Sequence, residues 1–549
     1  MSTGREELGE RMEHTPAEVA VPSGLARRAA RYRGWRWRIV PRTPAGVVIA
    51  AAAALALLFR VYPILRPGVL LGVSWYDDGV YFASALRLVN GALPYRDFFF
   101  AQPPGISLLL VPTALLARAA GTDAAMAVAR LLTLLASTAC VVTGGLLVRH
   151  RGLLAVIVTS GLLAVYPASV TTSHTIFIEP WVALFCVAGA LTVFDRDQPA
   201  AGRRLLWGGV IFGFGGAVES WAIVPTAVVL LLCLPAPRKL ATCLAGVAAG
   251  FLIPVLPFAL LAPVRFYQSV FIGQLVRYHQ TRVPVWTRLQ DMTGLEYLAN
   301  PGHLVLALVT VALVCFVAAA FAGASLITRR PPPPLECFAV ATAALVALAF
   351  MWPPGFFFHF PAFLAPFLAL AIALPASRAL AAIQLTGRLR GARWLQPAVA
   401  IAATVAVAVF AVIQASSEGS LRPRVPPKAI AAVRRVVPAG ACVLTDQVSF
   451  TIAASRFESS VPGCPLMIDP LGTDYALSPG RDGLTGAGAV PAVAKIMRNA
   501  FAHAQYVWLA GMYNRRRIAW TPELLAYFRK NFTRVLTDDR GDALYVRKG

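Results

Sequence analysis

Residues 61–105, VYPILRPGVLLGVSWYDDGVYFASALRLVNGALPYRDFFFAQPPG, form the first polar segment after the first long apolar run of the chain. Two adjacent carboxylates, Asp77 and Asp78, stand near its centre. Carboxylates fixed at a membrane–water boundary are costly, which favours a functional role. They also suit the first turn of a helix, and the sequence predicts one that Asp77 or Asp78 begins and Gly91 ends. Both roles are compatible, and we favour a catalytic one.

The composition is that of a polytopic α-helical membrane protein. Of 549 residues, 58% are hydrophobic and 14% charged, and several apolar runs reach about 20 residues, enough to cross a bilayer. The net charge of +24 is almost all arginine. These arginines separate the apolar runs and form no single domain face, so they indicate topology and not nucleic-acid binding. The lysine-poor, arginine-rich usage suggests a bacterium, and therefore its plasma membrane.

The positive-inside rule applied to these runs predicts about eleven transmembrane helices. Residues 1–43 are a basic cytoplasmic tail, and 44–415 form the membrane module. Its large first outer loop, 61–123, contains a further helix at PPGISLLLVPTALLARAAG that we expect at the interface. The run 205–235 is too long for one span, and Glu219 interrupts it, so we predict two short spans.

From residue 416 to 549 the composition changes to that of a soluble domain. Strand and helix patterns alternate, which predicts a small α/β domain. Eleven spans place this domain outside the cytoplasm, where disulfides persist. Cys442 and Cys464 are its only cysteines, so we predict a bond between them.

Most of the unusual polar residues fall in the predicted outer loops. They are Asp77, Asp78, Arg96, Asp97, Gln102, His174, Glu179, Glu219, Arg265, Gln274, Arg277, His279, Arg282 and His359. A transporter would place its ionisable groups near the membrane midplane, on broken helices. Acids and bases on one face indicate a site where a lipid-borne substrate meets an outer one.

The order of these motifs resembles the GT-C superfamily of membrane glycosyltransferases, in particular its protein O-mannosyltransferases and lipid A aminoarabinose transferases. An acidic pair is followed by a tyrosine, a helix ending in glycine, and Pro-Pro before an amphipathic helix. The matching residues are Asp77-Asp78, Tyr81, Gly91, Tyr95-Arg96-Asp97-Phe98, Gln102-Pro103-Pro104-Gly105, Ala129-Arg130-Leu131, Glu179-Pro180 and His359.

This resemblance implies a GT-C fold and transfer of a sugar from a polyprenyl-phosphate donor to an outer acceptor, usually with inversion. Asp77 takes the position of the general base and Asp78 that of the acid that follows it. A positioned carboxylate can accept the proton of an attacking hydroxyl. We expect a cell-envelope glycan as acceptor and a hexose or pentose, such as mannose or arabinofuranose, as the sugar. A protein or lipid acceptor, or a flippase or transporter of a lipid-linked sugar, are the alternatives.

Two departures from the family affect the donor phosphate, which cations should stabilise. Relatives often carry lysine where this chain has Glu219, and some carry lysine at Gln102. The basic loop 263–300 is therefore expected to hold the phosphate, because arginine donates two hydrogen bonds in a planar fork. The expected substrate-binding residues are Tyr81, Arg96, Asp97, Gln102, Glu179, Arg277, His279, Arg282 and His359, with Arg265 as a weaker candidate. No cofactor is firmly implied, and a divalent cation stays open.

Several of these residues have simpler interpretations. Glu179 fits the first turn of the helix that follows it, where an acid is favourable. His359 lies among aromatic residues and could be packed there, and His174 reads as a surface residue. Glu219 could pair with an arginine of the outer loops, and Asp97 could fix the turn around it.

Overall fold

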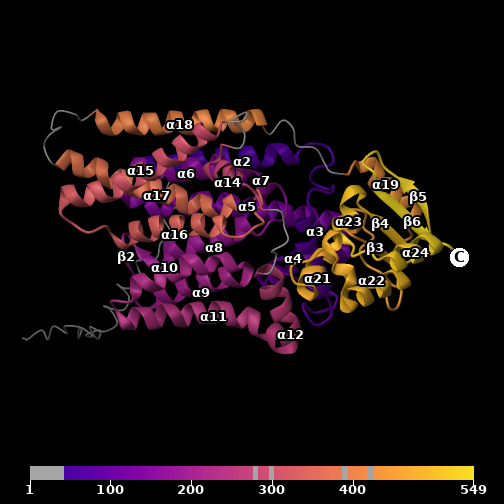
Figure 1. Cartoon of the computed structure of the whole chain (residues 1–549). Helices are drawn as coiled ribbons and strands as arrows, with labels where there is room; N and C mark the ends of the chain where they lie inside the picture. Colours follow the sequence, from indigo (N-terminus) through magenta and orange to yellow (C-terminus); the bar gives the residue numbers. More distant parts are fainter. Residues whose placement is uncertain (1–42, 276–281, 296–301, 386–393, 418–424) are drawn as a thin grey trace, which may run out of the picture.

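The computed structural model describes residues 43–275, 282–295, 302–385, 394–417 and 425–549. The helices of the membrane module run side by side, and the C-terminal domain covers one end of them, next to α3 and α4 (Figure 1). The predicted tail 1–42 lies outside the described residues, as do Arg277 and His279.

Seven helices in the described part of the chain are long and apolar enough to cross a membrane. They are α2 (Pro44–Ile64), α5 (Thr122–Val148), α11 (Pro237–Leu261), α15 (His303–Thr328), α16 (Pro334–Met351), α17 (Pro361–Leu385) and α18 (Leu395–Ser417). An eighth span results if α6 (Leu153–Val165) and the segment after it, which are bent by 56°, are counted together. The chain is thus a polytopic helical protein, while the number eleven stays a prediction.

The other three predicted crossings correspond to shorter helices of 11 to 16 residues, α8 (Glu179–Val193), α9 (Arg203–Val218) and α10 (Ile223–Cys233). The predicted break at Glu219 is confirmed, because this residue is extended, with φ −152° and ψ 134°, and ends α9. The break leaves the carboxylate of Glu219 at the tip of a helical hairpin.

The segment between α2 and α5 carries the two predicted helices. Helix α3 (Tyr76–Val89) ends just before Gly91, whose φ of +86° suits glycine, and α4 (Gly105–Ala120) follows. The two helices pack together around an apolar core that also includes residues of the C-terminal domain. The acidic pair therefore lies between the membrane module and that domain.

The C-terminal residues fold into a four-stranded sheet of order β3-β4-β6-β5. Strand β3 (Val443–Thr445) is parallel to β4 (Tyr506–Leu509), and β6 (Ala543–Arg547) is antiparallel to both β4 and β5 (Phe532–Thr537). The same domain contains the helices α19 (Pro427–Val436), α20 (Ser449–Ala453), α21 (Pro470–Leu477), α22 (Pro491–His503) and α24 (Pro522–Asn531).

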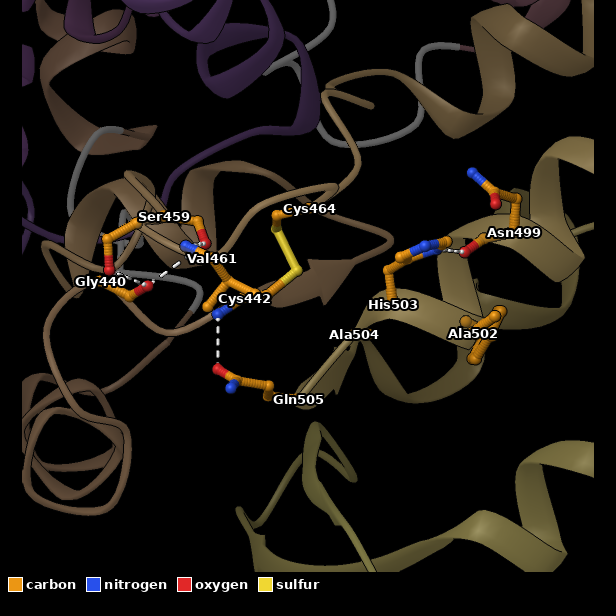
Figure 2. The surroundings of a disulfide bond; sticks show 12 residues. Gly440, Cys442, Ser459, Val461, Cys464, Asn499, Ala502, His503, Ala504 and Gln505 are labelled. Atoms are coloured by element: carbon orange, nitrogen blue, oxygen red, sulfur yellow. Dashed lines mark hydrogen bonds between the residues drawn. A yellow bond between two sulfur atoms is a disulfide. The ribbon is translucent and has the colours of Figure 1, made fainter.

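The predicted bond between Cys442 and Cys464 is present in the structure (Figure 2). The backbone N–H of Cys442 donates to the side chain of Gln505 over 3.1 Å, and the Gly440 carbonyl accepts from Ser459. The disulfide therefore ties the loop 459–464 to the start of β3.

Candidate active site

The acidic pair lies in the first turn of α3, where the partial positive charge of a helix N-terminus favours carboxylates. The helix begins at Tyr76, after Trp75, so the prediction that one of the acids begins it is wrong by one or two residues. Successive residues of an α-helix point about 100° apart, because a turn takes 3.6 residues. Asp77 is accordingly partly exposed, whereas Asp78 is fully buried.

Asp78 forms a buried ion pair with Arg130 of α5. Its Oδ2 accepts from Nη2 of Arg130 at 2.6 Å and from the hydroxyl of Thr175 at 2.6 Å. The same guanidinium donates to the carbonyls of Leu70 and Gly72, at 2.5 and 2.8 Å. This geometry joins three segments and favours a structural role for Asp78, unlike the catalytic role expected from sequence. In the sequence, Arg130 stood out only as part of Ala129-Arg130-Leu131, one of the motifs that resemble the GT-C superfamily.

A second buried pair joins Glu179, the first residue of α8, to His359, which lies just before α17. Glu179 Oε1 is 2.6 Å from Nδ1 of His359, and the imidazole stacks on Phe177 with ring centroids 4.7 Å apart. Burial lowers the pKa of His359, but the charges of Glu179, Asp77 and Glu219 outweigh it, so the pKa is raised. The nearby carboxylates thus favour the charged form of His359. Glu179 lies in the first turn of α8, as its simpler interpretation predicted, and its role in a substrate site stays a prediction.

Tyr81 lies one turn after the acidic pair and is buried. Burial raises the pKa of its phenol well above the ordinary value, as do the charges of Asp77, Glu179 and Glu219, while a hydrogen bond with Gln102 lowers it. The phenol thus stays protonated. The charges of the same three carboxylates raise the pKa of both Tyr81 and His359, and Glu179 and His359 are in direct contact.

Glu219 adds a third carboxylate to this site. Burial raises the pKa of Glu219 to about 7, the hydroxyl of Ser220 lowers it, and the charge of Glu179 raises it further. The Ser220 hydroxyl donates to Glu219 Oε1 over 2.8 Å. Among the described residues, the side-chain partner of Glu219 is Ser220 and not an arginine, while Arg277 lies outside them.

Arg96 and Asp97 pair with each other at the surface, at 2.7 Å. The Leu93 N–H donates to Asp97 over 2.7 Å, and the hydrogen bond from Arg96 keeps the pKa of Asp97 below its ordinary value. The interpretation of Asp97 as a turn-fixing residue is confirmed. Arg265 donates to the carbonyl of Arg96 at 2.7 Å, so the start of the loop 263–300 lies against this turn.

The described part of the basic loop provides two exposed candidates, Arg265 and Arg282. Arg288, from the same loop, is 1% exposed and donates to the carbonyls of Phe350 and Pro353, both at 2.6 Å. The Arg288 guanidinium is therefore bound by backbone carbonyls and stabilises the fold. Gln274 donates to the Ala101 carbonyl at 2.8 Å, which keeps this loop close to Gln102.

Two further expectations concern histidines and metals. The prediction of a surface position for His174 is wrong, since it is 6% exposed with Nε2 3.4 Å from the carbonyl of Phe59. Within the described residues, no group of three or more histidine, cysteine or acidic side chains is placed to hold a metal ion.

The fold is shared with solved membrane transferases. ArnT from Cupriavidus metallidurans is 14% identical with a TM-score of 0.52, over 90% of this chain and 98% of that one. The same protein bound to undecaprenyl phosphate is 14% identical with a TM-score of 0.54, over 91% of this chain and 97% of that one. The Archaeoglobus fulgidus oligosaccharyltransferase tethered to an acceptor peptide is 14% identical with a TM-score of 0.52, over 92% of this chain and 74% of that one. No protein-family model and no curated protein sequence matches the chain.

The chain has the GT-C fold. The resemblance to the GT-C superfamily that the order of motifs indicated is thus confirmed for the fold. Within the GT-C fold, the groups of the site come from distant parts of the sequence, namely α3, the start of α8, the α9–α10 turn and the residues before α17.

Proposed function

We propose that this chain is a membrane glycosyltransferase that moves a sugar from a polyprenyl-phosphate donor to an acceptor on the outer face of a bacterial plasma membrane. The observation that carries the proposal is the partly exposed carboxylate of Asp77 in the first turn of α3, whose charge raises the pKa of Tyr81 and of His359, the partner of Glu179. The GT-C fold supports it, because ArnT with that fold binds undecaprenyl phosphate.

In the proposed reaction, a hydroxyl of the acceptor attacks the anomeric carbon while the Asp77 carboxylate takes its proton. The bond from the anomeric carbon to the phosphate oxygen breaks, and the electron pair leaves with polyprenyl phosphate. Attack from the side opposite the phosphate inverts the anomeric centre. The neutral phenol of Tyr81 and the imidazolium of His359 supply hydrogen-bond donors to this site.

Cations must stabilise the leaving phosphate, and the lysines common in relatives are replaced by Gln102 and Glu219. We assign this role to the basic loop, through Arg277, Arg282 and His279. The position of residues 265–274 against the turn at Arg96 and Ala101 supports this assignment, because it brings the loop toward the site. The side chains of Arg96 and Asp97 bind each other and would contribute only at the edge of the site.

The acceptor in this proposal is a cell-envelope glycan, and the C-terminal domain faces the same compartment as the acceptor. Its disulfide supports that location, because disulfides persist outside the cytoplasm. A periplasmic reporter fused at Gly549 should therefore be active, and activity of a cytoplasmic reporter alone would contradict the topology.

The test compares a deletion strain with strains that carry the parent protein, Asp77→Asn or Asp195→Asn. Asp195 is an exposed carboxylate in the hairpin of β1 (Phe194–Asp195) and β2 (Gln198–Pro199), so its variant is the matched control. In the deletion strain and with Asp77→Asn, mass spectrometry of extracted lipids should show that a polyprenyl-phosphate sugar accumulates. The envelope glycans of these two strains should be truncated. The parent and Asp195→Asn should restore both. Unchanged lipids and glycans in the deletion strain would contradict the proposal.

A further inference from the structure

The residue before Asp77 is held by the C-terminal domain. The hydroxyl of Tyr76 donates to Asp469 Oδ1 over 2.6 Å. Asp469 also accepts from the N–H of Gly472 at 2.7 Å and so caps the N-terminus of α21. Its carboxylate is therefore fixed by its own helix before it meets Tyr76, about four hundred residues away in the sequence.

The ring of Tyr76 is held as well. The guanidinium carbon of Arg517 lies 4.4 Å from the centre of this ring and 4.9 Å from that of Tyr513. Arg517 is 7% exposed, and its Nη1 donates to Gln447 Oε1 over 2.8 Å. A cation over an aromatic face is attractive, more so when desolvated. The domain thus contacts both the hydroxyl and the face of Tyr76.

The backbone on either side of Asp77 meets the same domain. Ser449, the first residue of α20, donates its hydroxyl to the carbonyl of Trp75 over 3.3 Å. A Cβ atom built at Gly79 would come within 2.5 Å of the Ser449 nitrogen, so α20 lies directly on the helix backbone there. In Figure 1, α23 (Asn514–Arg517) of the C-terminal domain lies next to α3.

We infer that the C-terminal domain positions the catalytic carboxylate, with Tyr76 as the positioning residue and with Asp469 and Arg517 as its anchors. The inference rests on the proposed function, because it needs Asp77 as general base. A base works only within hydrogen-bond reach of the proton that it takes, and a misplacement of about 1 Å can cost about a hundredfold in rate. The domain would thereby be a part of the catalytic apparatus and not only a cover.

Tyr76→Phe tests this inference, because it removes the hydroxyl and keeps the ring over Arg517. Tyr506→Phe is the matched control, because the hydrogen bond from the Tyr506 hydroxyl to the carbonyl of Val436 is exposed and long, at 3.5 Å. Purified full-length protein is given the lipid extract of the deletion strain with envelope glycan, and release of polyprenyl phosphate is measured. Tyr76→Phe should lower kcat about 10- to 100-fold. The half-saturating amount of extract and the binding of undecaprenyl phosphate should not change, and Tyr506→Phe should match the parent.

A double variant separates positioning from a merely structural role. If Tyr76 acts through Asp77, adding Tyr76→Phe to Asp77→Asn should cause no further loss of rate. A parental kcat for Tyr76→Phe, or the same fold loss in the Asp77→Asn background as in the parent, would overturn the inference alone. A parental rate for Asp77→Asn would instead overturn the assignment of the base in the proposed function.

Discussion

Replacement of Arg130 by methionine should destabilise the protein strongly. The variant keeps a long apolar side chain but removes the guanidinium, which is 1% exposed and donates to Asp78, Leu70 and Gly72. Removing one partner of a buried ion pair costs about 3–5 kcal/mol, because the other charge stays buried. Each carbonyl left without its donor adds about 1 kcal/mol. The Asp78 carboxylate itself is 0% exposed, so water cannot replace the lost partner.

The assay is the thermal unfolding midpoint of the purified full-length protein in detergent. Arg118→Met is the matched control, because Arg118 is exposed and, among the described residues, donates to the carbonyl of Val89 alone, at 2.6 Å. Its loss should cost less than about 1 kcal/mol. Adding Asp78→Asn to Arg130→Met should recover part of the loss, because no unpaired carboxylate is then buried. A midpoint for Arg130→Met no lower than that of Arg118→Met would refute the reasoning.

Three further predictions follow from the described residues. Replacing Cys442 and Cys464 by serine opens a loop of 22 residues and should cost about 3 kcal/mol, seen as a lower unfolding midpoint; an unchanged midpoint under non-reducing conditions would contradict the bond. Burial raises the pKa of Asp446 to about 7, so as pH rises from about 4 to about 7 the unfolded chain loses this proton first and stability falls. Asp446→Asn should make the unfolding midpoint less dependent on pH over that range, and an unchanged pH dependence would contradict the assignment. Arg282→Ala should weaken the binding of undecaprenyl phosphate about tenfold, with partial rescue by Arg282→Lys, and unchanged binding would remove Arg282 from the phosphate site.

Much of the local structure could be predicted because it depends on short-range patterns. Apolar runs gave the long helices, Gly91 marked the end of α3, and Glu219 marked the break between α9 and α10. The order of motifs indicated the GT-C fold, although the solved structures with that fold are only 14% identical to this chain. Patterning survives such divergence because many side chains satisfy the same apolar requirement.

The pairing of the polar side chains could not be read in the same way. Asp77 and Asp78 are neighbours in sequence, and only the packing of α3 against α5 shows that one is buried against Arg130. Glu179 and His359 are 180 residues apart, so no local pattern joins them. His174 was expected at the surface, but the bend after α6 turns it toward the carbonyl of Phe59. Such contacts depend on tertiary geometry.

The most direct test of the proposed chemistry is the release of polyprenyl phosphate by purified parent protein and by Asp77→Asn. The lipid extract of the deletion strain serves as donor and the envelope glycan fraction as acceptor. We expect the parent to release polyprenyl phosphate only when the acceptor is present, and Asp77→Asn to be slower by about 10²–10⁴ while it still binds undecaprenyl phosphate. Release at the parental rate by Asp77→Asn would contradict this account.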